Sequence, residues 1–272
     1  MARHRSAAAK RDRKKSFRSA IVIVVVLAIF GTVGFAWYSS NANFRKLDEI
    51  TLCPVNPDST TVLLVDVTDP MTVPQRQDFR NQFNQLRRSI KRYGRLTIVR
   101  VNSTSSELLL PVITRCNPGQ GKDVSEETGN PKKIQKMWDE GFDAPLDAAF
   151  ASIVQAAPAD QSPILESIQS VALTELNKNR TASKPSELVI VSDLLQHTAK
   201  IDFYKRLPDP AALIKTPSFN QVRTDLSGVR IQLWMLQRGD SVTTQPRALI
   251  ELWESLLGAE GAVVDRAYNV SG

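Results

Sequence analysis

The stretch Thr61-Val-Leu-Leu-Val-Asp-Val-Thr-Asp-Pro-Met-Thr72 decides the fold of this 272-residue chain. Four apolar residues, Val62 to Val65, lead directly into Asp66, and a polar turn follows before a long amphipathic segment begins. This order is typical of a buried strand that ends in a turn and is followed by a helix. Open α/β sheets bind ligands at such carboxyl ends of strands, so Asp66 is the first candidate site residue.

Strand and helix patterns alternate through the rest of the chain. A helix is predicted over 73–93, where Thr72 and Gln75 have the spacing of a capping box. Further helices are predicted over 132–155, 164–179 and 247–257, and further strands over 95–101, 108–114, 187–193, 229–236 and 261–267. Such alternation predicts a Rossmann-like α/β fold with a mostly parallel, doubly wound sheet and helices on both faces.

The net charge of +7 is concentrated at the N-terminus. Residues 1–18 contain eight Lys or Arg residues and one acid, Asp12, so this tail alone accounts for the whole net charge. The rest of the chain carries equal numbers of basic and acidic residues. The basic isoelectric point therefore does not describe a DNA-binding face, and no nucleic-acid partner is expected.

An uncharged run, Ala20–Tyr38, follows the basic tail. As a helix it would be about 28 Å long, which matches the hydrocarbon core of a bilayer. Basic residues before the run predict a cytoplasmic N-terminus and a C-terminal part in the periplasm or outside the cell. We therefore expect a cytoplasmic tail (1–19), a transmembrane helix (20–38) in the inner or plasma membrane, a linker (39–60) and one α/β domain (61–272).

Two other interpretations of the apolar run are weaker. A buried core helix is disfavoured because nothing in the run is polar enough to form a second face. A cleaved signal peptide stays an alternative, since Ser40-Asn41-Ala42 offers small residues at the spacing of a peptidase site. The run exceeds the apolar segment of about 7–15 residues in signal peptides, which favours an uncleaved single-pass anchor.

Both cysteines, Cys53 and Cys116, lie after the apolar run. The compartment beyond the membrane is oxidising, and an even number of cysteines there predicts one disulfide. Two unrelated buried thiols are the alternative. A metal site is not expected from two cysteines alone, because zinc needs further ligands.

Three polar positions are expected to meet at the carboxyl edge of the sheet. They are Asp66 with Thr68 and Asp69 behind it, Ser162 at a turn before a helix, and Asp193 after an apolar strand. Hard divalent cations prefer carboxylate and hydroxyl oxygens, so the sequence predicts a site for Mg²⁺ or Mn²⁺. Its predicted ligands are Asp66, Thr68, Ser162 and Asp193, with Asp69 as an additional candidate. Capping of the turns that follow is the alternative role of Asp66 and Asp193.

These segments resemble the von Willebrand factor A-type (VWA) family. That family carries a metal-ion-dependent adhesion site made of D-x-S-x-S after its first strand, a Thr in a T-P-L-like turn, and an Asp after its fourth strand. The corresponding stretches here are Asp66-Val67-Thr68-Asp69-Pro70, Ser162-Pro163-Ile164 and Val191-Ser192-Asp193, in the same order. The resemblance implies a VWA-like fold over residues 61–270 and a module that binds a protein partner.

The family pattern is incomplete in this chain. Pro70 replaces the second hydroxyl ligand, and Ser162 stands where Thr is usual. Thr72 could supply the lost hydroxyl, although its capping role is the simpler interpretation. Asp69 adds a carboxylate that the pattern does not contain. The implied adhesion site is therefore degenerate.

Enzyme patterns are weak in this chain. A phosphatase of the haloacid dehalogenase type needs a second Asp two residues after the first, and that position is Thr68. A Ser-His-Asp site would depend on His197, since His4 lies in the tail, and no G-x-S-x-G turn is present. Gly119-Gln-Gly121-Lys122 lacks the spacing of a phosphate-binding loop. No catalytic residue is expected.

The expected function is that of a membrane-anchored binding or scaffold module. It would hold a protein partner at the face around Asp66, Ser162 and Asp193, where a bound cation could be completed by a carboxylate of the partner. One alternative is an envelope-anchored, metal-dependent phosphoester hydrolase that uses Asp66, Asp69 and Asp193. Another is a scaffold domain of a membrane assembly that binds no metal.

Overall fold

The computed structural model describes residues 21–38, 45–101, 103, 108–126, 129–155, 159–177, 184–237 and 247–270. The chain forms two units, Met1–Lys46 and Leu47–Gly272. The first contains the helix Ile21–Tyr38, whose 18 residues are long and apolar enough to cross a membrane. The predicted apolar helix is confirmed from Ile21 onward, whereas the tail 1–19, Ala20 and the start of the linker lie outside the described residues.

Six strands of the second unit form one sheet in the order β3-β2-β1-β4-β5-β6. The strands are β1 (Thr60–Val65), β2 (Arg95–Arg100), β3 (Pro111–Cys116), β4 (Ser186–Ser192), β5 (Val229–Leu236) and β6 (Val263–Val270). All neighbours are parallel except β2 and β3. The mostly parallel sheet is therefore confirmed, and its strand order changes direction between β1 and β4, at the kind of switch point where α/β sheets bind ligands.

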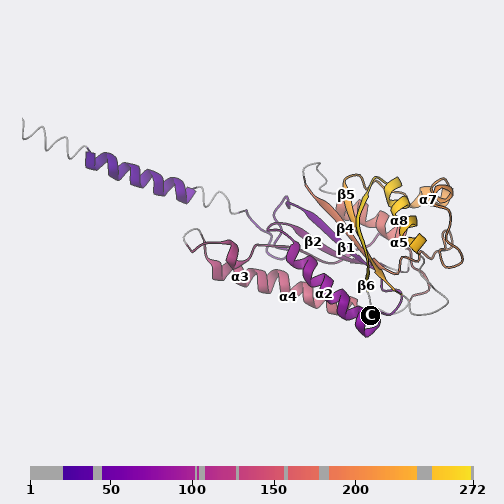
Figure 1. Cartoon of the computed structure of the whole chain (residues 1–272). Coiled ribbons are helices and arrows are strands. Elements are labelled where there is room, and N and C mark those ends of the chain that lie inside the picture. Colours follow the sequence, from indigo (N-terminus) through magenta and orange to yellow (C-terminus); the bar gives the residue numbers. More distant parts are fainter. Residues whose placement is uncertain are drawn as a thin grey trace, which may run out of the picture. The chain divides into compact units, whose positions relative to one another are not determined.

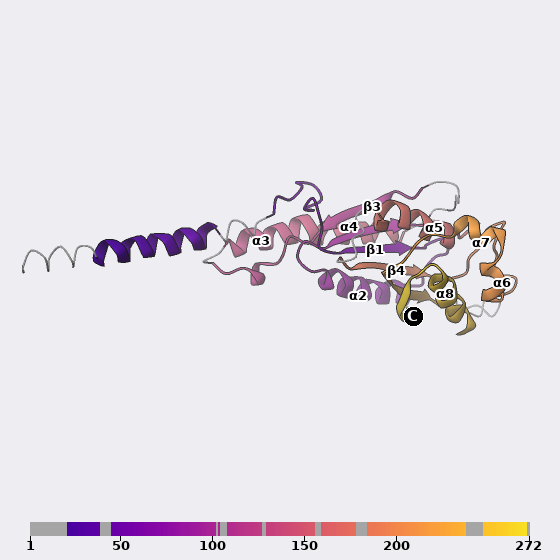
Figure 2. The same cartoon turned by 90° about the horizontal axis from the view of Figure 1, so that it is seen from above.

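Helices cover both faces of this sheet (Figure 1). On one face lie α2 (Val73–Ser89) and α4 (Ala144–Ile153), and on the other lie α5 (Ile164–Val171) and α8 (Arg247–Ala259). The remaining helical segments are η1 (Gly121–Asp123), α3 (Pro131–Trp138), η2 (Asp139–Asp143), η3 (Ala172–Leu176), α6 (Pro210–Ile214) and α7 (Pro217–Val222). Figure 2 shows α6, α7 and α8 close together beside the sheet.

The residues of β1 belong alternately to two hydrophobic cores. Val62 and Leu64 pack on the side of α5 and α8, while Leu63 and Val65 pack on the side of α2 and α4. A strand that is covered on both faces needs apolar residues at every position, which explains the unbroken apolar run in the sequence. The chain leaves this strand at Asp66, at the edge of both cores.

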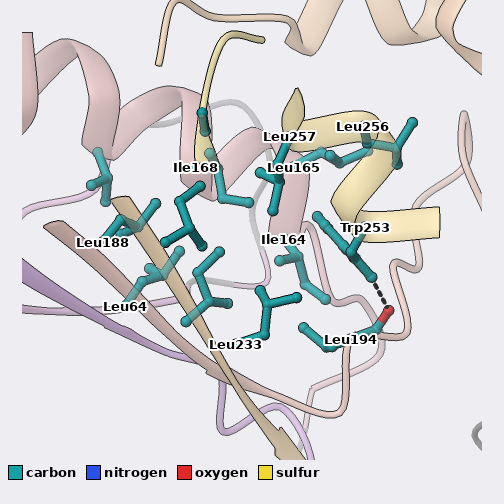
Figure 3. Packing of buried hydrophobic residues seen from close by; sticks show 14 of the residues in the cluster. Leu64, Ile164, Leu165, Ile168, Leu188, Leu194, Leu233, Trp253, Leu256 and Leu257 are labelled. Atoms are coloured by element: carbon teal, nitrogen blue, oxygen red, sulfur yellow. Dashed lines mark hydrogen bonds between the residues drawn. The ribbon is translucent and has the colours of Figure 1, made fainter. Parts of the chain in front are cut away.

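The core on the side of α5 and α8 surrounds Trp253, which is 0 % exposed. Figure 3 shows Ile164, Leu194 and Trp253 lying close together. The Trp253 Nε1 donates a hydrogen bond of 2.9 Å to the carbonyl oxygen of Leu194, which satisfies the indole N–H in an otherwise apolar setting. The bond fastens α8 to the turn that follows β4.

The chain enters the α/β unit along Leu47–Pro54, and this segment is tied to the rest of the unit. Cys53 and Cys116 form a disulfide, as predicted. Leu52 packs against Gly141 of η2, where an added Cβ would lie 2.5 Å from the Leu52 Cδ1, so glycine permits this close approach. The segment therefore belongs to the compact unit, although the sequence assigns it to the linker.

Removal of the disulfide should destabilise the α/β unit. Replacing Cys53 and Cys116 by Ala should lower the free energy of unfolding by about 4 kcal/mol, because the bond closes a long loop in the unfolded chain. Urea denaturation of the full chain in detergent micelles measures this change. A reductant should destabilise the wild type by a similar amount and leave the variant unchanged. An equal effect of the reductant on both proteins would contradict the prediction.

A buried carboxylate lies at the amino edge of the sheet, where α8 ends. Glu260 is 5 % exposed, and its Oε1 accepts a hydrogen bond of 3.1 Å from the backbone N–H of Thr224. This bond joins the two segments that lead into β5 and β6. Burial raises the pKa of Glu260 to about 7, an increase that the Thr224 N–H and the Arg223 guanidinium oppose only in part.

The raised pKa of Glu260 predicts a pH-dependent stability. Its pKa of about 7 in the folded chain exceeds the ordinary value of 4.5, so stability is lost as the pH rises through this window. The variant Glu260→Gln does not titrate and keeps an acceptor for Thr224. Between about pH 4 and about pH 8, the free energy of unfolding of the wild type should fall by about 3 kcal/mol more than that of this variant. Urea denaturation at about pH 4 and about pH 8 measures the difference. Glu251→Gln, on the exposed face of α8, is the matched control, and an equal pH effect in both variants would refute the assignment.

Candidate functional site

The register of the sheet brings two polar residues together where β1 and β4 end. Val65 pairs with Val191, so Asp66 and Ser192 follow side by side at the carboxyl edge. The backbone N–H of Asp66 donates a hydrogen bond of 2.8 Å to the carbonyl oxygen of Val191, which continues the ladder beyond the last residue of β1. The carboxylate of Asp66 therefore has a fixed position at the switch point of the sheet.

The Asp66 carboxylate is the centre of a buried polar cluster. Its Oδ1 accepts hydrogen bonds from the backbone N–H of Thr68 at 3.0 Å and from the Thr68 hydroxyl at 2.7 Å. Its Oδ2 accepts from the hydroxyls of Ser162 and Ser192, both at 2.8 Å. All four residues are at most 6 % exposed. We call these residues the Asp66 cluster; in it each carboxylate oxygen accepts two hydrogen bonds.

The structure brings together Asp66, Thr68 and Ser162, three of the four predicted ligands. Ser192 belongs to the same cluster but was not predicted as a site residue. Its hydroxyl donates to Asp66 and accepts a hydrogen bond of 2.9 Å from the backbone N–H of Leu194. The sequence alone does not indicate this role, because it follows from the register that places Ser192 beside Asp66 in the sheet.

Asp193 is buried next to the cluster but faces its own turn. Its Oδ1 accepts a hydrogen bond of 3.0 Å from the backbone N–H of Leu195. Leu194 between them has a φ of 63°, a left-handed conformation that is costly for a side chain with a Cβ. The carboxylate of Asp193 thus stabilises a strained turn, in accord with its alternative role as a capping residue.

Ser162 is positioned by the loop after β4. Its backbone N–H and carbonyl exchange hydrogen bonds of 3.0 and 2.9 Å with those of His197. The N-cap of α5 is Pro163, which makes no side-chain cap. Instead, the Oε1 of Gln196 accepts a hydrogen bond of 2.9 Å from the backbone N–H of Leu165. Two backbone bonds and one side-chain cap therefore place the Ser162 hydroxyl beside Asp66.

More exposed side chains border the cluster. Tyr204 is 42 % exposed, and its hydroxyl donates a hydrogen bond of 3.4 Å to the Oδ2 of Asp69. The His197 ring packs edge-on against Tyr204, and its Nδ1 lies 3.3 Å from the Oδ1 of Asp202. Burial alone would raise the pKa of Asp202, but the Tyr204 N–H, His197 and Lys205 outweigh it and lower that pKa. We call Asp69, His197, Asp202, Tyr204 and Lys205 the carboxyl-edge rim.

The carboxylate and hydroxyl oxygens of the Asp66 cluster are the types of ligand that a hard cation prefers. The hydroxyls of Thr68 and Ser162 each donate to Asp66, and a hydroxyl oxygen has two lone pairs, so each can also accept. In the part of the chain that the structure describes, no group of three or more His, Cys, Asp or Glu residues could hold a metal ion. A cation at this edge would therefore depend on hydroxyl ligands, and its presence stays a prediction.

No family model matches this chain, and no curated protein is significantly similar to it. The functional argument therefore depends on the geometry of the Asp66 cluster and the carboxyl-edge rim.

The Asp66 cluster should contribute strongly to stability. Asp66→Ala removes the acceptor of four hydrogen bonds in a buried site and should lower the free energy of unfolding by at least about 3 kcal/mol. Ser192→Ala should cost about 1–2 kcal/mol. Asp160→Ala, at an exposed carboxylate in the same loop as Ser162, should change stability by less than about 0.5 kcal/mol. Equal losses for Asp66→Ala and Asp160→Ala in urea denaturation would refute this role.

Proposed function

We propose that this chain is a single-pass membrane protein whose α/β domain binds a protein partner on the extracytoplasmic side. The helix Ile21–Tyr38 supports the anchor by its length and composition. The excess of basic residues before it supports a cytoplasmic N-terminus. The disulfide between Cys53 and Cys116 supports an oxidising compartment for the domain.

The observation that carries the proposal is the position of the Asp66 cluster. It lies at the carboxyl ends of β1 and β4, where the strand order changes direction. Residues from three separate segments, Asp66-Val67-Thr68, Ser162 and Ser192, meet there, and this supports the VWA resemblance in part, because Ser192 contacts Asp66 where the resemblance implies Asp193. We therefore propose a VWA-like, Rossmann-like domain whose recognition surface is this edge.

The carboxyl-edge rim supplies the surface that a partner would contact. Tyr204 offers an exposed aromatic ring with a polar tip, a type of side chain that is enriched where proteins bind one another. Asp69 lies within hydrogen-bond distance of that ring's hydroxyl, and Lys205 lies 3.4 Å from Asp202. The rim is polar and carries both signs of charge, which fits a protein surface better than an apolar small molecule.

A divalent cation is part of this proposal. Mg²⁺ or Mn²⁺ would be held by the hydroxyl oxygens of Thr68 and Ser162 beside the Asp66 carboxylate, and Asp193, which follows Ser192 in the chain, is the remaining predicted ligand. When bound, it would supply a coordination position for a carboxylate of the partner. The protein's own residues keep the hydroxyls in place, because both donate to Asp66 and neither can rotate without losing that bond.

Site-specific photocrosslinking tests the proposal in native membranes. A photoreactive phenylalanine derivative at position 204 should give a discrete adduct with one partner protein. The same residue at position 263, where Val263 is 61 % exposed on β6, should not give it. The adduct from position 204 should disappear with EDTA and return with Mg²⁺.

Each outcome separates the parts of the proposal. An adduct that survives EDTA would refute the cation and leave the binding role in place. No adduct from position 204, or the same adduct from both positions, would refute binding at the carboxyl edge.

A further inference from the structure

A polar pocket lies at the amino edge of the sheet, apart from the Asp66 cluster. Its volume is about 610 Å³. The end of α7, the loop before β5 and the end of α8 form its walls, and the lining residues are Asn220, Arg223, Thr224, Asp225, Ser227 and Gly258–Gly261. Carboxylate, guanidinium, amide and hydroxyl groups dominate this lining. The pocket therefore suits a polar or charged ligand.

Glu260 is the buried charged group of this pocket. The residue is 5 % exposed, and the described part of the chain gives its carboxylate a single hydrogen bond, from the Thr224 N–H. A carboxylate offers about four acceptor positions, so most of those on Glu260 remain for donors of a ligand. The contrast with Asp66 is direct, because the Asp66 carboxylate accepts four hydrogen bonds from the protein.

The charges around Glu260 favour a cation. The lining contains two carboxylates, Asp225 and Glu260, and one guanidinium, Arg223. Arg223 donates a hydrogen bond of 3.1 Å to the carbonyl oxygen of Ala259, the last residue of α8. The C-terminus of this 13-residue helix adds partial negative charge. With both carboxylates ionised, the side chains that line the pocket carry one more negative than positive charge.

From these observations we infer that the pocket beside Glu260 binds a primary ammonium group. An ammonium has three N–H donors and one positive charge, which match the acceptor positions of Glu260 and the excess charge of the pocket. A metal ion fits less well, since no group of three or more His, Cys, Asp or Glu residues among the described residues could hold one. The ammonium can come from a small free amine or from a lysine side chain of a polypeptide.

Gly261 brings two walls of the pocket close together. Gly261 has a φ of 88°, and a Cβ there would lie 2.6 Å from the Ser227 Oγ. The two segments that carry Glu260 and Asp225 are therefore held close together. The buried carboxyl has a pKa of about 7, so an ammonium that binds at neutral pH must also displace a proton from part of the molecules.

Isothermal titration calorimetry on the full chain in nanodiscs of zwitterionic lipid tests this inference. Methylammonium chloride and Nα-acetyl-lysine amide serve as the two ammonium sources, and potassium chloride at equal ionic strength is the reference. We expect saturable binding of at least one ammonium source at about pH 8, where the carboxylate is ionised. Tighter binding of the lysine derivative would identify a polypeptide side chain as the ligand, and tighter binding of methylammonium a free amine.

Variants and proton release show whether Glu260 is the binding group. Glu260→Gln should weaken binding by at least about tenfold, and Asp225→Asn should weaken it less. The matched control Glu251→Gln, at an exposed position of α8 outside the pocket, should bind like the wild type. At pH 7, titrations in two buffers should show release of about half a proton per ligand. Equal binding by Glu260→Gln and the wild type, equal binding of potassium, or the absence of saturable binding would each overturn the inference.

Discussion

The hydrogen bonds to the Asp66 carboxylate are the constraint on which the carboxyl edge depends. A carboxylate that is 4 % exposed is tolerated only if its oxygens are paired. The four donors come from the turn after β1, the turn before α5 and the end of β4. Because these acceptor positions are all occupied, none of the three segments can shift without leaving part of the carboxylate unpaired. The cluster therefore fixes where the loops of this edge begin.

Leu194 connects the Asp66 cluster to helix α8 through its two backbone groups. The Leu194 N–H donates to the Ser192 hydroxyl, and the Leu194 carbonyl accepts from Trp253 of α8. A leucine in the left-handed region costs about 1–2 kcal/mol, so the conformation persists because both of its backbone groups are bonded. The aliphatic side chain is itself 0 % exposed. The turn at Leu194 consequently contributes both to the packing of α8 and to the geometry of the Asp66 cluster.

Local patterns in the sequence predict the apolar helix, the alternation of strands and helices, the disulfide and the meeting of three polar segments. What they miss depends on contacts between distant residues. In the sequence Ser192 is only a polar residue at the end of a strand, and its role depends on the register of β4 against β1. The first long helix ends before its predicted limit because the Asn117 side chain donates to the carbonyl of Ile90, which adopts an extended conformation. Leu52 docks on Gly141 without any periodic signal.

The parallel sheet also separates the entering chain from the Asp66 cluster. Cys116 pairs with Arg95, the first residue of β2, so the disulfide to Cys53 fastens the entering segment at the amino edge. Asp66 follows the last residue of β1 and lies at the other edge, about 20 Å away along a strand that rises about 3.3 Å per residue. The helices α2, α5 and α8 each precede a parallel strand and return the chain to the amino edge, whereas α3 and α4 follow the antiparallel β3 and lead the chain to the carboxyl edge. Parallel connectivity is thus what allows a rigid entry segment and an exposed rim in one small domain.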